Sequence, residues 1–164
     1  MIMFGIKEYE PIFFSDTYEF MKEHGEGLRR LKGSQLEAII TVHHAKDGEF
    51  WSDCPVILVI GGKQLEFCSF KDCVSVTWDE IDVNEGLDWY GSQNLQLGWQ
   101  ENMVENVTSM IGKKIEKVEI IEASPGILHG IGFQIGASYF CIFNALDETG
   151  FSCVKNDGHT YPKL

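Results

Sequence analysis

The middle quarter of this 164-residue sequence has no positively charged side chain. Between Lys71 and Lys113 there is neither Lys nor Arg, whereas the interval holds eight Asp and Glu residues. The net charge of −12 divides into −3 for residues 1–71, −8 for residues 72–112 and −1 for residues 113–164. A chain with a pI near 4.7 is repelled by nucleic-acid phosphates and by anionic membranes. We therefore expect no nucleic acid and no membrane as partners, and we expect any protein partner to be basic.

The sequence also lacks an apolar run of the about 20 residues that a membrane-spanning helix needs. Its first residues are apolar, but no basic residue stands before them, so they do not match the pattern of a signal peptide. The five cysteines are an odd number, which without an export signal favours reduced thiols. These absences predict a cytoplasmic protein. The length and the 44% hydrophobic content fit one globular domain spanning residues 1–164.

Short catalytic and cofactor-binding motifs are absent as well. The sequence contains no CxxC, HxH or HExxH spacing, no GxSxG elbow, no phosphate-binding GxxxxGK[ST] loop and no GxGxxG turn. Most of the cysteines lie in apolar or alternating stretches, where a free cysteine is usually a small buried hydrophobe. We therefore predict no catalytic residue, no metal site and no cofactor, and we do not expect an enzyme.

What the sequence does contain is a clear β-strand pattern. Apolar and β-branched runs alternate with glycine-containing turns, and they predict an α+β fold with a mainly antiparallel sheet of about seven or eight strands. Helical spacing predicts two helices, over residues 17–24 with Asp16 as N-cap, and over residues 101–111. Gly25 and Gly112 are expected to end them. Residues 79–98 have little periodicity and are expected to form a long loop.

The two halves of the sequence resemble each other. Gly33, Leu36 and Val42 match residues 79 positions later, and the hairpin turn at Gly61-Gly62 matches Gly136-Ala137 at an offset of 75. This similarity indicates an internal duplication of a helix, a strand, a hairpin and a final strand. The pseudo-repeats would be residues 16–78 and 101–154, joined by an acidic connector at 79–100. The alternative is that any two amphipathic β-meanders align this well by chance.

Histidine and cysteine suggest a second class of function. A small enzyme or a metal- or ligand-binding protein could use His43 or His44 together with His129 and a cysteine. Adjacent residues on a strand point to opposite faces, so only one of His43 and His44 could join a given site. Ordinary strand or core positions are the alternative interpretation of all three histidines.

The acidic segment is the main candidate for a functional surface, because it combines carboxylates with aromatic side chains. Carboxylates steer a basic partner, and tryptophan and tyrosine are the side chains in which interface energy concentrates. The predicted partner-binding residues are Asp79, Glu80, Asp82, Glu85, Asp88, Trp89, Tyr90 and Trp99. Two alternatives remain: a solvated connector whose tryptophans pack into the core, or a homo-oligomer that uses the tryptophans as its interface.

In general type the chain resembles the small acidic bacterial immunity proteins that neutralise a cognate toxin. The similarity lies in the absence of catalytic motifs and in the acidic aromatic stretches Trp78-Asp79-Glu80-Ile81-Asp82 and Asp88-Trp89-Tyr90. It implies a non-enzymatic binding module whose partner is a basic toxin. Toxic nucleases are basic because they bind nucleic acid. The resemblance assigns no role to any single residue.

Overall fold

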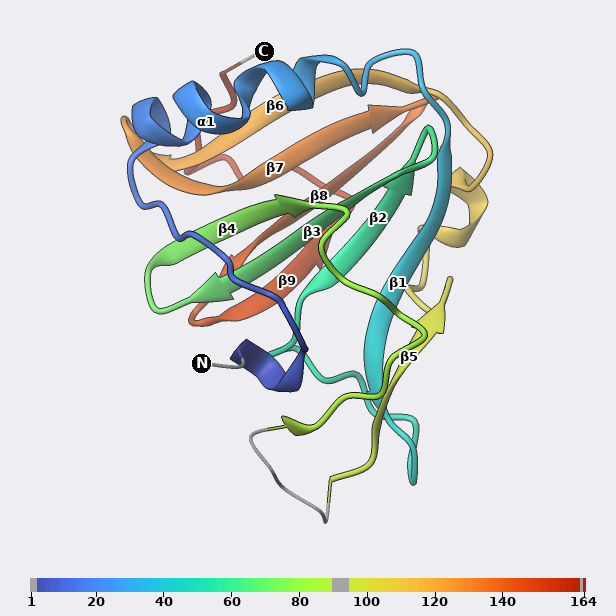
Figure 1. Cartoon of the computed structure of the whole chain (residues 1–164). Coiled ribbons are helices and arrows are strands. Elements are labelled where there is room, and N and C mark those ends of the chain that lie inside the picture. Colours follow the sequence, from blue (N-terminus) through green and yellow to red (C-terminus); the bar gives the residue numbers. More distant parts are fainter. Residues whose placement is uncertain (1–2, 90–94, 163) are drawn as a thin grey trace.

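The fold consists of two antiparallel β-sheets that face each other, with one α-helix against the second sheet (Figure 1). The computed structural model describes residues 3–89, 95–162 and 164. The first sheet has the order β4-β3-β2-β1-β5, with β1 Leu36–His44, β2 Val56–Ile60, β3 Lys63–Phe70, β4 Cys73–Trp78 and β5 Leu97–Glu101. The second sheet follows the chain order, with β6 Ile115–Ser124, β7 Ile127–Ile135, β8 Ser138–Ala145 and β9 Glu148–Ser152.

This architecture confirms the predicted α+β class and its antiparallel pairing, and it corrects two details. The described residues form nine strands in two sheets, where about seven or eight strands in one sheet were expected. The additional strand, β5, lies partly within the expected loop and pairs with β1, with Val42 opposite Trp99. Leu97 and Trp99 lie two positions apart and pack on the same face of the sheet. Gly98 between them hides this strand pattern in the sequence.

The second predicted helix, over residues 101–111, is wrong. Within this described range the only helical element is the 3-10 turn Thr108–Met110. Glu101 completes β5, and Asn102 and Asn106 have left-handed φ values of 56° and 67°, which an α-helix excludes. The apolar spacing was nevertheless informative, because Val107 and Met110 are buried in the core.

The one α-helix of the described residues, α1 Thr17–Arg29, begins as predicted but continues beyond the expected end. The side chain of Asp16 caps it by accepting a hydrogen bond of 2.9 Å from the Glu19 N–H. Gly25 and Gly27 lie inside the helix, each at a cost of about 1 kcal/mol relative to alanine. Full burial of Leu28 offsets this cost. Gly27 also lets the helix pack closely on Trp78, because a Cβ at this position would lie only 3.0 Å from the Trp78 ring.

The main hydrophobic core lies between the inner faces of the two sheets. Strand β3 faces β8 and β9, and β4 faces β7 and β8. Phe67 of the first sheet and Phe133 and Phe140 of the second are fully buried in this core, and α1 adds Phe20 and Leu28. Burying a side chain of this size contributes about 1.5–3 kcal/mol, so the two inner faces stabilise each other.

A second, smaller core covers the outer face of the five-stranded sheet. Phe4, Ile6 and Tyr9 of the N-terminal segment and Ile81 of the acidic segment pack there against side chains of β1, β2 and β3. The two covering segments are also joined to each other, because the Asp88 N–H of the acidic segment donates a hydrogen bond of 3.0 Å to the Gly5 carbonyl of the N-terminal segment. The acidic segment is therefore a packed cover of this sheet face.

Each half of the chain contributes a four-stranded meander, β1–β4 and β6–β9. The predicted two-residue turns are present, and Gly61 and Gly62 have the positive φ values, 57° and 80°, that such a tight hairpin requires. The turn after β3 and the turn after β8 meet across the two sheets. The Asn144 amide donates to the carbonyls of Lys71 at 2.7 Å and Cys73 at 3.1 Å, and Asp147 accepts from the Lys71 N–H.

Because Asn144 also accepts from the Asp147 N–H at 2.9 Å, one side chain fixes both turns. We expect Asn144→Ala to lower the free energy of unfolding by about 1–3 kcal/mol, since it removes three hydrogen bonds, of which the one to the Cys73 carbonyl is part-buried. Urea unfolding followed by tryptophan fluorescence measures this change. Leu146→Ala is the control in the same turn, because the Leu146 side chain is 97% exposed. Equal losses in both variants would contradict this role of Asn144.

Candidate functional site

The five predicted carboxylates all reach solvent. Asp79, Glu80, Asp82, Glu85 and Asp88 are exposed on the segment that follows β4 and crosses the outer face of the five-stranded sheet (Figure 1). The neighbouring N-terminal segment adds the exposed carboxylates of Glu8 and Glu10. We call these seven residues the acidic face. One ion pair neutralises part of it, between Lys7 and Glu85 at 3.8 Å, and both side chains are exposed.

Two of these carboxylates also shape the backbone. Asp79 has a left-handed φ of 54°, and its Oδ1 accepts a hydrogen bond of 2.8 Å from the Gln64 N–H. Asp82 accepts from the Asn84 N–H at 2.9 Å, in the Asx-type geometry that favours turns. These carboxylates keep their charge at the surface while they fix the path of the segment.

The start of the acidic face is anchored by Glu66, a buried carboxylate of β3. It accepts hydrogen bonds from Thr77 Oγ1 at 2.7 Å, from the Gln64 amide at 2.9 Å and from the N–H groups of Glu80 and Ile81 at 3.1 and 3.3 Å. A carboxylate can be buried at low cost only when donors such as these satisfy its oxygens. No pattern in the sequence indicated this role, since Glu66 occupies an ordinary polar position in an alternating strand.

The predicted aromatic anchors are half-buried in the second core. Trp89 lies against Phe4 and Trp51, with ring centroids 6.1 and 5.8 Å away. Trp99 packs against the same cluster from β5. Tyr90 lies outside the described residues. Trp89 and Trp99 therefore help to hold the cover in place, and both side chains stay partly exposed.

A cleft opens between α1 and the end of β4, next to the acidic face. It has a volume of about 370 Å³, and its lining contains three carboxylates and no Lys or Arg. The lining residues are Glu10, Ile12, Glu23, His24, Val76, Thr77, Trp78 and Glu80. The pKa of Glu80 is raised by partial burial and by the charges of Glu66 and Glu10. We call this the acidic cleft. Sequence reasoning included only Glu80, because nothing local connects residues 10 and 23 with residue 80.

The rear wall of the acidic cleft is formed by His24 and Trp78. The indole N–H of Trp78 donates to His24 Nδ1 at 3.3 Å, and the His24 ring packs on Phe14 and Phe20. Burial lowers the pKa of His24 below its ordinary value, and the Glu23 carboxylate opposes this shift. The neutral ring is thus part of the packing.

This lowered pKa gives a pH dependence with a defined sign. Above the ordinary histidine pKa of about 6.5, His24 is neutral in both states and its stabilising contribution is complete. Below it, the unfolded chain binds the proton more readily, so the contribution declines with falling pH. We expect His24→Asn to be less stable than the wild type at about pH 7.5, with a gap that narrows toward about pH 5. Urea unfolding of both proteins across this range tests it, and a constant or widening gap would refute it.

The histidines of the alternative hypothesis lie on different sheets. His43, on β1, is buried and bonds to Thr41 Oγ1 at 2.7 Å and to the Gly48 carbonyl at 3.0 Å, and His44 lies 3.3 Å from Asp47. His129 is on β7 of the other sheet. No group of three or more His, Cys, Asp or Glu side chains within the described residues is placed to hold a metal ion.

Most of the thiols are unsuited to nucleophilic chemistry. Cys54, Cys68 and Cys141 are buried, and burial raises the pKa of Cys68 to about 12 and that of Cys141 to about 11. The pKa of Cys54 is raised for the same reason. A reactive cysteine needs a stabilised thiolate, which these environments oppose.

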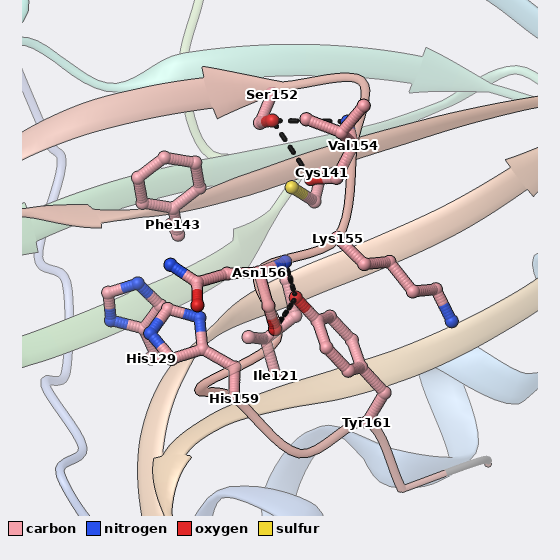
Figure 2. Close-up of a pocket in the computed structure, with 10 residues that line it drawn as sticks. All are labelled: Ile121, His129, Cys141, Phe143, Ser152, Val154, Lys155, Asn156, His159 and Tyr161. Carbon is pink, nitrogen blue, oxygen red and sulfur yellow. Dashed lines mark hydrogen bonds between the residues drawn. The ribbon is translucent and has the colours of Figure 1, made fainter.

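A second cavity, of about 310 Å³, lies on the outer face of the four-stranded sheet (Figure 2). Strand residues Ile121, His129, Cys141 and Phe143 line one side. The other side is lined by Ser152 at the end of β9 and by Val154, Lys155, Asn156, His159 and Tyr161 of the segment that follows. None of the lining residues is acidic. The pKa of His129 is lowered by burial and by the neighbouring His159. The structure therefore brings His129 near a cysteine and near His159, which the sequence did not single out.

Comparison with known proteins adds no family. No protein-family model, no curated protein and no solved structure matches this chain. Among the described residues there is no helix with the length and apolarity needed to cross a membrane. The acidic face, the acidic cleft and the second cavity are therefore the features of the molecule that bear on its function.

Proposed function

We propose that this protein is a non-enzymatic binding module whose acidic face engages a basic protein partner, and that the partner is a toxin which it inhibits in the manner of an immunity protein. The observation that carries the proposal is the combination of the acidic face with the acidic cleft. All five predicted carboxylates are exposed, and one of them, Glu80, lines a cavity that contains three carboxylates and no Lys or Arg.

Electrostatics favours this surface for association. A large share of the net charge of −12 lies on the segment that follows β4. Such a field raises the rate at which a basic protein arrives, and the effect weakens when salt screens it. The segment is also held by the second core and by Glu66, so little conformational entropy is lost on binding.

The acidic cleft suits the side chain of a lysine or arginine. A cation there would be attracted by the carboxylates of Glu10, Glu23 and Glu80. It would also offset the repulsion from Glu10, which adds to partial burial and to the charge of Glu66 in raising the pKa of Glu80. Trp78 and the 65% exposed Ile12 offer apolar surface for its aliphatic stem. An anchored cation surrounded by a polar rim is the usual arrangement of an interface hot spot.

A test begins with capture of partners from the native organism, followed by affinity measurement with the purified partner. The face variant carries Asp79→Asn, Glu80→Gln, Asp82→Asn and Asp88→Asn together, because amides keep the turn hydrogen bonds and remove the charge. The matched control neutralises four exposed carboxylates elsewhere, through Glu37→Gln, Glu49→Gln, Glu116→Gln and Asp157→Asn.

We expect the face variant to bind at least about tenfold more weakly and the control to change much less, since rim charges act locally. Binding of the wild type should weaken steeply with salt. The purified wild type should also inhibit the toxic activity of the partner. A partner that is indifferent both to salt and to the face variant would sink the proposal.

We also propose that the chain is one domain in which residues 16–78 and 101–154 arose by internal duplication of a four-stranded meander, without the second helix that the sequence predicted. Two four-stranded meanders with tight turns at matching positions support this, as do the equivalent turn residues Asp72 and Asp147. Because the main core draws on both sheets, residues 101–164 expressed alone should be unfolded by circular dichroism. A cooperatively folded fragment would argue against a single domain.

The second candidate function is a small enzyme or a metal- or ligand-binding protein. The sequence hypothesis used His43 or His44, His129 and a cysteine. The observation in its favour is that His129 and Cys141 line one cavity, together with His159.

A further inference from the structure

The second cavity brings together two histidines from distant parts of the chain. His129 lies on β7 and His159 on the C-terminal segment, and their ring centroids are 4.5 Å apart with an interplanar angle of 58°. Figure 2 shows the two rings side by side, next to Asn156. Ring nitrogens of His129 and His159 make no hydrogen bond or ion pair within the described part of the chain. Both rings line the second cavity, and their nitrogens have no hydrogen-bond or ion-pair partner among the described residues.

Both rings are held in position by their surroundings. His129 stacks on Phe143, with a centroid distance of 5.2 Å and an angle of 21°. Next to His159, Thr160 exchanges backbone hydrogen bonds of 2.9 and 3.0 Å with Glu122 of β6. The two rings therefore meet before any ligand arrives, which is the arrangement of a preorganised site.

The rest of the segment is also attached to the sheet. Earlier in the segment, Lys155 forms an ion pair of 2.7 Å with Glu119 and lies over the rings of Tyr139 and Tyr161. Beyond His159, the Ile120 N–H donates to the Pro162 carbonyl at 3.0 Å. The ammonium of Lys155 is thus engaged with Glu119, and in Figure 2 it points away from the histidine pair.

We propose that His129 and His159 together bind one divalent transition-metal ion of the borderline class, such as Zn²⁺, Co²⁺ or Ni²⁺. With metal–nitrogen bonds of about 2.0–2.1 Å, two imidazoles on one ion have ring centres roughly 4.5–5.2 Å apart at bond angles of roughly 90–110°. The observed 4.5 Å lies at the lower end of this range. Imidazole favours these ions, whereas Mg²⁺ and Ca²⁺ prefer oxygen ligands.

The site offers two protein ligands, and the remaining coordination positions belong to water or to a further ligand. The second cavity has room for both, at about 310 Å³. The bound ion would join the C-terminal segment to β7 and so close this side of the four-stranded sheet. This inference develops the second candidate function and is independent of the acidic face.

The experiment uses the full chain without a histidine tag, stripped of metal with a chelator. Titration with ZnCl₂ against a chromogenic chelator measures stoichiometry and affinity, and CoCl₂ absorption reports nitrogen ligation. We expect one ion per chain. His129→Gln and His159→Gln should each weaken binding by roughly tenfold or more, since loss of a ligand costs at least as much as loss of its supporting hydrogen bond. Zn²⁺ should slow amide exchange of residues 156–161.

Three control variants separate this site from other donors. His44→Gln removes a histidine of the other sheet, Cys153→Ser removes the exposed thiol, and Cys141→Ser removes the buried thiol in the cavity. All three should bind Zn²⁺ as the wild type does. His159→Gln lies on the covering segment, so it remains informative if His129→Gln does not fold. Absence of Zn²⁺ binding, unchanged binding in His159→Gln, or loss of binding in any control variant overturns the proposal, and none of these results affects the acidic-face test.

Discussion

The mutual burial of the two inner sheet faces is the constraint on which the rest of this structure depends. Each meander has one strongly apolar face, and neither could remain exposed to water without a large free-energy cost. Phe67 of one sheet and Phe133 and Phe140 of the other are fully buried only because the two halves meet. The hydrogen bonds from Asn144 to the turn after β3 fix how the sheets align at one end.

Once the inner faces are joined, the two outer faces determine where function can lie. The outer face of the five-stranded sheet is itself apolar, and the N-terminal and acidic segments cover it. The outer face of the four-stranded sheet is covered by the C-terminal segment through Thr160 and Lys155. Both proposed sites are formed where such a cover meets a sheet. A short stretch of chain there needs packing on one side only, which leaves its other side free for charge or for ligands.

Much of the fold could be predicted because its signals are local. Alternation identified the strands of both meanders, Gly61-Gly62 identified a hairpin, and Asp16 identified the start of the helix. The errors arose where long-range contacts overrode local preference. Burial of Leu28 extends α1 through two glycines, and pairing with β1 converts residues 97–101 into a strand. The left-handed φ values of Asn102 and Asn106 then exclude the second helix.

The sequence by itself determined the distribution of charge, the β-rich class and the exposure expected of Asp79, Glu80, Asp82, Glu85 and Asp88, because composition and periodicity are properties of neighbouring residues. Only the tertiary structure decided that Glu10 and Glu23 join Glu80 in the acidic cleft, that Glu66 anchors the segment, and that His129 meets His159. Those meetings follow from the pairing of strands and from the way the covering segments cross the sheets. Contacts between residues 14 to 70 positions apart leave no periodic trace in the sequence, so they become visible only in the folded chain.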